Sequence, residues 1–264
     1  MIKLIATDLD NTLFDSNGQI PEESVRLLKL AASRGTAAAV ASGRCFPSAR
    51  LAAATVGAAT PVICYNGAQI RRADGGTLFT SCVPAAVVSG IVDFCRERGL
   101  YLQMYDNDEI VVEKLDRSRH DDPDLDNTTY REVGDFRRMK PFKTPKILIA
   151  AATETVPALQ AELEERYNGK AYFAQSESYL IEIMAAGVDK GSALRELMRI
   201  LSLKKEEVMA LGDNTNDIPM LEAAGLSVAV ANAVPSLKSV ADYVCAGERS
   251  EGFNEAVRRF VLGE

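Results

Sequence analysis

The order of local patterns along the chain is the strongest constraint on its fold. Near the N-terminus, short apolar segments alternate with helical patterns, and the same alternation returns after Val188. Strands separated by helices of this length predict βαβ units and a parallel sheet with right-handed crossovers. The N-terminal part predicts strands at Ile2–Thr7, Ala37–Ala41 and Pro61–Tyr65, and helices at Glu22–Arg34 and Arg44–Val56.

The middle of the chain has a different character, because strand patterns there come in pairs rather than alternating with helices. The segments YLQMY and EIVVE predict a hairpin around the turn DND, and the polar stretch Leu115–Phe136 predicts a loop. Further patterns predict helices at Val87–Arg98 and Val156–Tyr167, and strands at Lys146–Ala151, Ala171–Ser176 and Tyr179–Met184.

The C-terminal part resumes the regular alternation of helices and strands. Its patterns predict helices at Ser192–Ile200 and Ile218–Ala224, strands at Val208–Gly212, Leu226–Val230 and Ala241–Cys245, and a final helix. The simplest arrangement is an α/β core with a Rossmann-like parallel sheet and helices on both faces. We expect residues 1–82 and 186–264 to form this discontinuous core, and residues 83–185 to form an inserted α+β domain.

Composition excludes several classes of function. The net charge of −7 and the pI near 5.0 argue against general binding to nucleic acid or to an anionic membrane. No apolar run approaches the roughly 20 residues of a membrane span, and the chain starts directly on a predicted strand, without a signal peptide. The five cysteines are scattered without a C-x-x-C pair, so neither a disulfide framework nor a zinc site is indicated. We therefore expect a cytoplasmic protein.

Histidine chemistry is also disfavoured, because His120 is the only histidine and lies in a polar, loop-like stretch. A mechanism with a histidine base or several histidine ligands would have to rely on that single residue.

Polar side chains gather where predicted strands or loops give way to helices. Each has an ordinary explanation alone, since aspartate, serine and asparagine are favoured in caps and turns, and lysine is mostly exposed. Open α/β sheets, however, bind ligands at the carboxyl ends of their strands. The four motifs concerned are DLDNTL with Asp8 and Asp10, ASGR with Ser42 and Gly43, GVDKGSAL with Lys190, and LGDNTNDIPML with Asp213, Asn216 and Asp217.

Together these groups suit a magnesium ion and a phosphate. Carboxylates are hard oxygen ligands for Mg²⁺, and an ammonium, a hydroxyl and an amide can donate to phosphate oxygens. Asp8 and Asp10 would repel each other at the end of one strand, so a positive charge is needed nearby. We expect Asp8 and Asp213 to hold Mg²⁺, which keeps several waters and leaves room for a phosphate oxygen.

The four motifs, in this order, resemble those of the haloacid dehalogenase (HAD) phosphohydrolase superfamily. The long insertion between the second and third motifs, NGA at Asn66–Ala68 and GDNTNDIPML near the end are similar to its Cof-type subfamily (IIB). The resemblance spans essentially the whole chain. It implies an aspartyl-phosphate mechanism, with the inserted domain acting as a cap that selects the substrate.

The resemblance assigns roles in catalysis and metal binding to four acidic residues. Asp8 matches the nucleophile that attacks phosphorus and becomes an aspartyl phosphate. Asp10 matches the general acid and base, and its backbone carbonyl matches a metal ligand. Asp213 matches the acidic residue that binds the metal directly. Asp217 matches a carboxylate that orders the metal site without binding the ion itself.

A second group matches positions that bind phosphate or substrate. Ser42 and Lys190 match the phosphate-binding residues of the second and third motifs, and Gly43 permits close backbone approach. Asn216 matches a contact to the substrate phosphate, and Thr12 a position that steadies the first loop. Arg44 is a candidate for substrate specificity.

One position departs from the family pattern, which reads D-x-D-G-T, because Asn11 stands in place of glycine. Asparagine tolerates positive φ better than most residues, so the turn should be preserved. The chemistry also requires Asp10 to carry a proton when the leaving alcohol departs. Two nearby carboxylates in different environments can divide the nucleophilic and acidic roles in this way.

The predicted function is a Mg²⁺-dependent phosphatase that hydrolyses a small phosphorylated metabolite, with a sugar phosphate as the expected substrate. A phosphosugar mutase of the same superfamily is one alternative, and a non-enzymatic switch that is phosphorylated on an aspartate is another. The expected partner is a small phosphate ester, with no nucleic acid or membrane partner, and the chain is expected to be a monomer or a weak homodimer.

Overall fold

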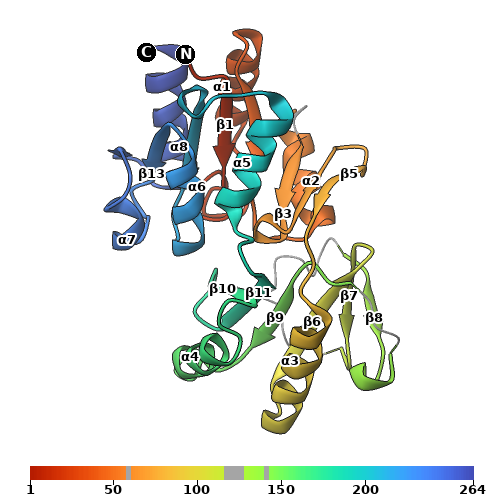
Figure 1. Ribbon diagram of the computed structural model, residues 1–264. Helices are drawn as coiled ribbons and strands as arrows, with labels where there is room; N and C mark the ends of the chain where they lie inside the picture. Colours follow the sequence, from red (N-terminus) through yellow and green to blue (C-terminus); the bar gives the residue numbers. More distant parts are fainter. Residues whose placement is uncertain (58–60, 116–127, 140–142) are drawn as a thin grey trace. The chain divides into compact units, whose positions relative to one another are not determined.

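The computed structural model describes residues 1–57, 61–115, 128–139 and 143–264. The chain divides into two compact units, one formed by Met1–Phe79 with Asp189–Glu264 and the other by Thr80–Val188 (Figure 1). Each is described by itself, and the first is called the catalytic unit after the role expected of it from the sequence, the second the inserted unit. His120 and much of the polar stretch predicted as a loop lie outside the described residues.

The catalytic unit is built on a five-stranded sheet in the order β14-β13-β12-β1-β2, and every neighbouring pair is parallel. β1 (Leu4–Thr7) lies between β2 (Ala37–Val40) and β12 (Val208–Gly212). Thr7 is level with both Val40 and Leu211. The carboxyl ends of these strands, from opposite ends of the chain, therefore lie beside one another.

Helices cover both faces of this sheet (Figure 1). The further strands are β13 (Leu226–Ala229), β14 (Tyr243–Val244), β3 (Val62–Cys64), β4 (Gln69–Arg71) and β5 (Thr77–Thr80). The helices are α1 (Glu22–Ser33), α2 (Phe46–Thr55), α5 (Lys190–Leu201), α6 (Ile218–Ala223), α7 (Pro235–Lys238) and α8 (Arg249–Val257). The predicted Rossmann-like sheet with helices on both faces is confirmed.

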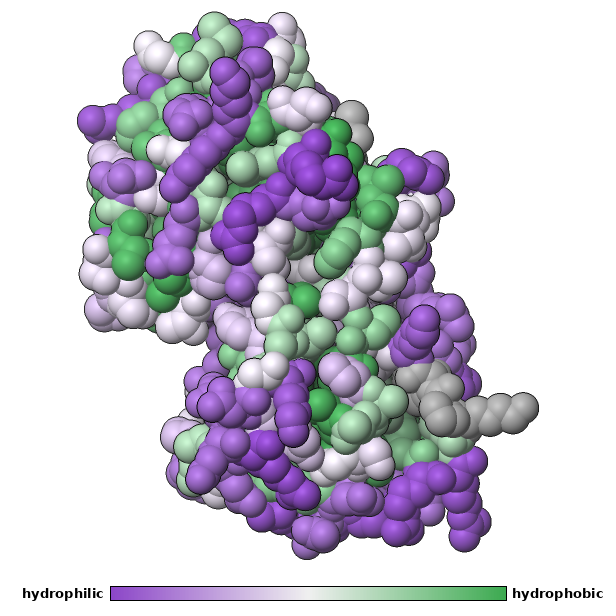
Figure 2. Space-filling view, in the orientation of Figure 1, coloured by the Kyte–Doolittle hydropathy of each residue, from purple (hydrophilic) through white to green (hydrophobic). Residues whose placement is uncertain are grey.

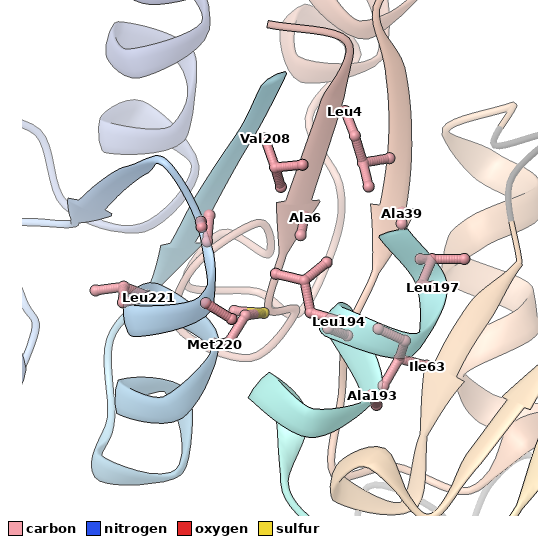
Figure 3. Packing of buried hydrophobic residues seen from close by; sticks show 14 of the residues in the cluster. Leu4, Ala6, Ala39, Ile63, Ala193, Leu194, Leu197, Val208, Met220 and Leu221 are labelled. Atoms are coloured by element: carbon pink, nitrogen blue, oxygen red, sulfur yellow. The ribbon is translucent and has the colours of Figure 1, made fainter. Parts of the chain in front are cut away.

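The core on one face joins the sheet to α5 and α6. Leu194 of α5 and Met220 of α6 meet Leu4 and Ala6 of β1, and all four side chains are completely buried (Figure 3). Ile5, which alternates to the opposite face, is also completely buried. Burial on both faces explains why these strands read as continuous apolar runs.

The strand predicted at Pro61–Tyr65 does not join the parallel sheet as a full member. β3 pairs antiparallel with β4 in a separate three-stranded sheet, and among the described residues one parallel bridge, between Ile63 and Ala41 directly after β2, links it to the five-stranded sheet. The predicted strand is thus present as β3 and bridges in parallel, but the sequence analysis did not predict β4 and β5. These strands are short, so their patterns gave little periodicity to read.

The inserted unit contains a six-stranded sheet in the order β10-β11-β9-β6-β7-β8. The hairpin predicted around DND is confirmed, with Asn107 and Asp108 at φ values of 50° and 66°. A strand, β8, lies within the stretch predicted as a loop. The elements are α3 (Ala85–Arg98), β6 (Tyr101–Asp106), β7 (Glu109–Val112), β8 (Tyr130–Glu132), β9 (Ile147–Ala150), α4 (Val156–Arg166), β10 (Ala171–Ala174) and β11 (Leu180–Ala185).

The two faces of this second sheet differ in chemistry. On one face, every second residue of the strands, for example Ile147 of β9, belongs to an apolar core shared with α3 and α4. The strand register places Gln103, Tyr105 and Glu182 on the opposite face. Glu182 there pairs with Lys146 at 2.8 Å, with side chains 2% and 3% exposed, and Gln103 donates a 2.7 Å hydrogen bond to the Tyr105 hydroxyl. This face therefore combines buried polar side chains that contact one another with a small apolar cluster of Leu148, Ala150 and Leu180.

The surface shown in Figure 2 intersperses hydrophilic and apolar residues on each unit. Among the described residues, the large hydrophobic side chains that are exposed are Met1, Leu51, Val240 and Val244. In the described part of the chain, no helix has the length and apolar character needed to cross a membrane.

We predict that Gly191→Ala destabilises the protein by about 1–3 kcal/mol or more, the usual cost of overpacking a core. A Cβ at Gly191 would lie 2.0 Å from the backbone oxygen of Pro219, so α5 and α6 would have to separate. Urea unfolding measures the loss. Arg195→Ala, on the exposed side of α5, is the matched control and should change stability by less than about 0.5 kcal/mol. Equal stability of the two variants would contradict the close approach of α5 and α6.

Candidate active site

Three of the four motifs extend from the carboxyl ends of the sheet's central strands. Asp8 directly follows β1, and its backbone N–H donates to the oxygen of Leu211 in β12 at 3.1 Å. Ser42 follows β2 after one residue, and Asp213 directly follows β12. The topology thus brings residues from distant parts of the sequence to one edge of the sheet, as open α/β sheets do at ligand sites.

Lys190 enters this edge from the first turn of α5. The helix begins there because Asp189 forms a capping box with Ser192, whose N–H donates to the Asp189 carboxylate at 2.6 Å. Lys190 Nζ then lies 2.6 Å from Asp8 Oδ1 and 2.6 Å from Asp217 Oδ1. Its side chain is only 1% exposed, so this ammonium is buried between two carboxylates.

The loop after β12 is ordered by Asp217. Its Oδ2 accepts hydrogen bonds from the backbone N–H groups of Asp213 at 3.0 Å and Asn214 at 3.2 Å. Thr12 Oγ1 donates to Asp213 Oδ1 at 3.0 Å, which connects the first loop to the fourth. Both oxygens of Asp217 are therefore engaged, one by Lys190 and the other by the backbone of the loop.

Asp8, Asp213 and Asp217 form an acidic cluster in which each residue offers a carboxylate oxygen, all within 4.8 Å of one another. These hard oxygens suit Mg²⁺, which commonly takes one or two carboxylates and retains waters. The cluster has three acidic groups facing one ammonium, so a divalent cation also fits its charge.

Burial shifts the titration of the cluster. It raises the pKa of Asp8 well above its usual range, against the opposing effect of Lys190, and Asp217 and Asp213 raise it further. Burial, with a contribution from Asp217, raises the pKa of Asp213 to about 7. For Lys190, burial alone lowers the pKa, but Asp217 and Asp8 outweigh it and raise the pKa above the ordinary value. The ammonium therefore stays protonated.

Asp10 lies outside the acidic cluster and pairs with Arg44. Arg44 Nη2 is 2.5 Å from Asp10 Oδ1, and Nε is 2.8 Å from Oδ2, so both carboxylate oxygens are held. The guanidinium also donates to Ser48 Oγ at 3.1 Å and lies over the ring of Phe14. Both oxygens of Asp10 are thus engaged by Arg44, whereas the predicted first step of the reaction requires one of them to carry a proton for the leaving group.

The second motif is tied to the fourth through Asn66. The backbone N–H of Asn66 donates to the oxygen of Ser42 at 3.1 Å, and its side-chain oxygen accepts from Asn216 Nδ2 at 3.1 Å. A Cβ at Gly43 would lie 3.0 Å from that same Asn66 oxygen, so glycine gives the needed space. The structure therefore brings Ser42, Gly43 and Asn216 together, and Asn66 is the connecting residue.

Two contacts of the site were missed from sequence. Asn66 was noted only as part of NGA, although its φ of 52° is the left-handed conformation that asparagine tolerates. Asn11 also has positive φ, at 58°, so the expected turn is preserved without glycine. Asn232 was not singled out at all, and it donates to the backbone oxygen of Asn11 at 2.9 Å. An asparagine in an ordinary loop carries no local signal for such a distant partner.

Comparisons with known proteins identify the family. A family model described as haloacid dehalogenase-like hydrolase matches residues 5–257. The chain is 30% identical to phosphoglycolate phosphatase of Methanoculleus marisnigri, over 98% of this chain and 97% of that protein. It is 27% identical to the 5-amino-6-(5-phospho-D-ribitylamino)uracil phosphatase YitU of Bacillus subtilis, over 98% and 96% of the two chains. A solved haloacid dehalogenase-like hydrolase from Bacteroides thetaiotaomicron superposes with a TM-score of 0.87 at 29% identity, covering 98% and 99%.

The chain belongs to the haloacid dehalogenase-like hydrolase family, because the family model matches nearly all of it. The predicted Cof-type membership and the predicted class of enzyme, a phosphate monoester hydrolase, are confirmed. The roles of individual residues remain predictions at this point.

We predict that Mg²⁺ binding strengthens as the pH rises through about 7. Below that pH Asp213, whose pKa is about 7, is mostly protonated and must lose its proton before it can bind a cation. Below about pH 7, the affinity for Mg²⁺ should therefore fall about tenfold for each unit by which the pH is lowered, for each proton released on binding. Isothermal titration of the metal-free protein with Mg²⁺, in buffers of different ionisation enthalpy, measures affinity and proton release together. A constant affinity between about pH 6 and pH 8 would contradict this.

Proposed function

We propose that this protein is a Mg²⁺-dependent phosphatase that hydrolyses a small phosphorylated metabolite of the sugar-phosphate class through an aspartyl-phosphate intermediate. The observation that carries the proposal is the buried ammonium of Lys190, which bridges Asp8 and Asp217 beside Asp213. A nucleophilic carboxylate and a phosphate are both negative, so positive charge at this position is the first requirement of the reaction.

The similar proteins support a small substrate. One is named for phosphoglycolate and another for a phosphoribitylamino compound, and both names describe small phosphate monoesters. The second carries its phosphate on a sugar-derived chain. We therefore place the substrate of this protein among phosphorylated polyols and sugars.

In the first step, a carboxylate oxygen of Asp8 bonds to phosphorus, the ester P–O bond breaks, and the leaving oxygen takes a proton from Asp10. Lys190 neutralises charge on the phosphate oxygens as they move into the plane of the transition state. Ser42, the Gly43 backbone and Asn216 hold the phosphate in line with Asp8. Mg²⁺, when held by Asp8, Asp213 and the Asp10 carbonyl, supplies further neutralisation of negative charge.

In the second step, Asp10 takes a proton from water, whose oxygen bonds to phosphorus as the bond to Asp8 breaks. Inorganic phosphate leaves and Asp8 is again a carboxylate. In the structure Arg44 donates to both carboxylate oxygens of Asp10. For the first step one oxygen of Asp10 must be released from Arg44 and protonated, so we propose that substrate binding changes this ion pair.

We assign substrate selection to the inserted unit, Thr80–Val188, as the cap expected from the family. One face of its sheet carries buried polar pairs, such as Gln103 with Tyr105 and Lys146 with Glu182, which give that unit an ordered polar framework. Exclusion of water by such a unit strengthens electrostatic interactions within the site.

We predict that inorganic phosphate is released from sugar phosphates in the presence of Mg²⁺ and that EDTA abolishes the release. A panel of sugar phosphates, nucleotides and pyridoxal phosphate, assayed by a phosphate-detection dye, gives the measurement. Conversion to an isomeric sugar phosphate without phosphate release would instead identify a mutase. A stable phosphorylated Asp8 without turnover would identify a phospho-acceptor.

We predict that Asp8→Asn abolishes turnover, because an amide cannot act as the nucleophile. Asp10→Asn should slow turnover by about 10²–10⁴-fold, the usual contribution of a general acid or base. Steady-state phosphate release on the best substrate measures both. Asp74→Asn, an exposed aspartate in the catalytic unit, is the control and should retain wild-type turnover. Full activity of the Asp10 variant would remove the proposed acid–base role.

A further inference from the structure

The loop after β13 contacts both loops that carry the predicted metal ligands. The backbone N–H of Val234 donates to the oxygen of Asp213 at 2.8 Å. Two residues earlier, Asn232 Nδ2 donates to the backbone oxygen of Asn11 at 2.9 Å, across 221 positions of sequence. One loop therefore connects the turn after β1 to the turn after β12.

The orientation of the Asn232 amide is determined by its two partners. Its oxygen accepts a 2.7 Å hydrogen bond from the backbone N–H of Arg249, at the start of α8. Its nitrogen faces the carbonyl of Asn11. Only one of the two amide orientations satisfies both, because one partner donates and the other accepts. The side chain thus bridges the first residue of α8 and the first motif.

The peptide unit between Asn11 and Thr12 is held from several sides. Asn232 binds its oxygen, and its N–H, which belongs to Thr12, donates to the oxygen of Leu9 at 3.3 Å. Thr12 Oγ1 in turn donates to Asp213 Oδ1. Asn11 has a φ of 58°, so this turn is in a conformation that asparagine tolerates less easily than glycine does. An external hydrogen bond is a direct way to hold it.

We propose that Asn232 is a positioning residue for the metal site. By binding the Asn11 carbonyl, it fixes the turn that presents Asp10 and Thr12 and thereby sets the distance between the ligand groups of the first and fourth motifs. The inference rests on the proposed function for the identity of the ion, Mg²⁺. Residues that orient metal ligands commonly change metal affinity by about 10–100-fold when they are removed.

A purely structural role would act through α8 alone. Asn232 would then serve only to accept the N–H of Arg249, in the way a helix-capping side chain does. The two roles use different atoms of one side chain, so they can be separated. The substitution Asn232→Asp keeps the acceptor and adds a charge that favours a helix N-terminus, but it removes the donor to Asn11.

The experiment compares Asn232→Ala and Asn232→Asp with the wild type, and Asn17→Ala serves as a control because Asn17 is an exposed residue that contacts Asp15. Thermal unfolding of the metal-free proteins reports on α8. Isothermal titration with Mg²⁺ reports on the metal site independently of activity, and kcat and KM for phosphate release are measured at saturating Mg²⁺.

We expect both Asn232 variants to bind Mg²⁺ at least about tenfold more weakly than the wild type, whereas Asn232→Asp keeps the metal-free melting temperature and Asn232→Ala lowers it. The added negative charge in Asn232→Asp by itself attracts a cation, so weaker binding must come from the altered contact to the Asn11 carbonyl, where an acceptor oxygen replaces the amide donor. The kcat should fall more than KM changes, because the displaced groups act on the reacting centre. The Asn17 variant should match the wild type throughout.

The inference is overturned if Asn232→Asp binds Mg²⁺ as tightly as the wild type, or if Asn232→Ala changes only the melting temperature. Wild-type protein that binds Mg²⁺ but releases no phosphate would overturn the proposed phosphatase and leave the positioning role testable by titration. Wild-type protein without any Mg²⁺ binding would overturn both.

Discussion

The buried ammonium of Lys190 is the interaction on which the catalytic unit depends. It contacts carboxylates of Asp8 and Asp217 at 2.6 Å each, and it joins the end of β1 to a helix that starts 182 positions later. Removing one member of a buried ion pair typically costs about 3–5 kcal/mol, since the remaining charge stays buried and unpaired. The contacts that hold these distant segments together are therefore also contacts of the candidate site.

Close packing around Lys190 depends on positions where a side chain would not fit. A Cβ at Gly67 would lie 2.2 Å from the oxygen of Asp189, and a Cβ at Gly212 would lie 2.5 Å from the Cβ of Asp217. Together with Gly191 against Pro219, these glycines let loops and helices approach at backbone distance. The ammonium can then reach both carboxylates from the first turn of α5.

The excess of negative charge in the acidic cluster connects structure to function. One ammonium cannot balance three buried carboxylates, and the raised pKa values of Asp8 and Asp213 are the consequence of burial and mutual repulsion. A divalent cation would offset the excess negative charge of the carboxylates. The negatively charged phosphate could then bind beside the cation and Lys190. A cation bound at this cluster would relieve the repulsion among its carboxylates.

The sequence alone determined the parallel core, the strand ends that carry Asp8, Ser42 and Asp213, and the start of a helix at Lys190. These features are local, because the periodicity of strands and helices and the capping residues can be recognised within a few positions of the sequence. Only the tertiary structure decided the partners. Arg44 on Asp10, Asn66 on Asn216, Asn232 on Asn11 and the separate sheet of β3 all depend on which distant segments meet. A hydrogen bond between remote residues leaves no periodic trace in the sequence, since its geometry exists only once the chain has folded.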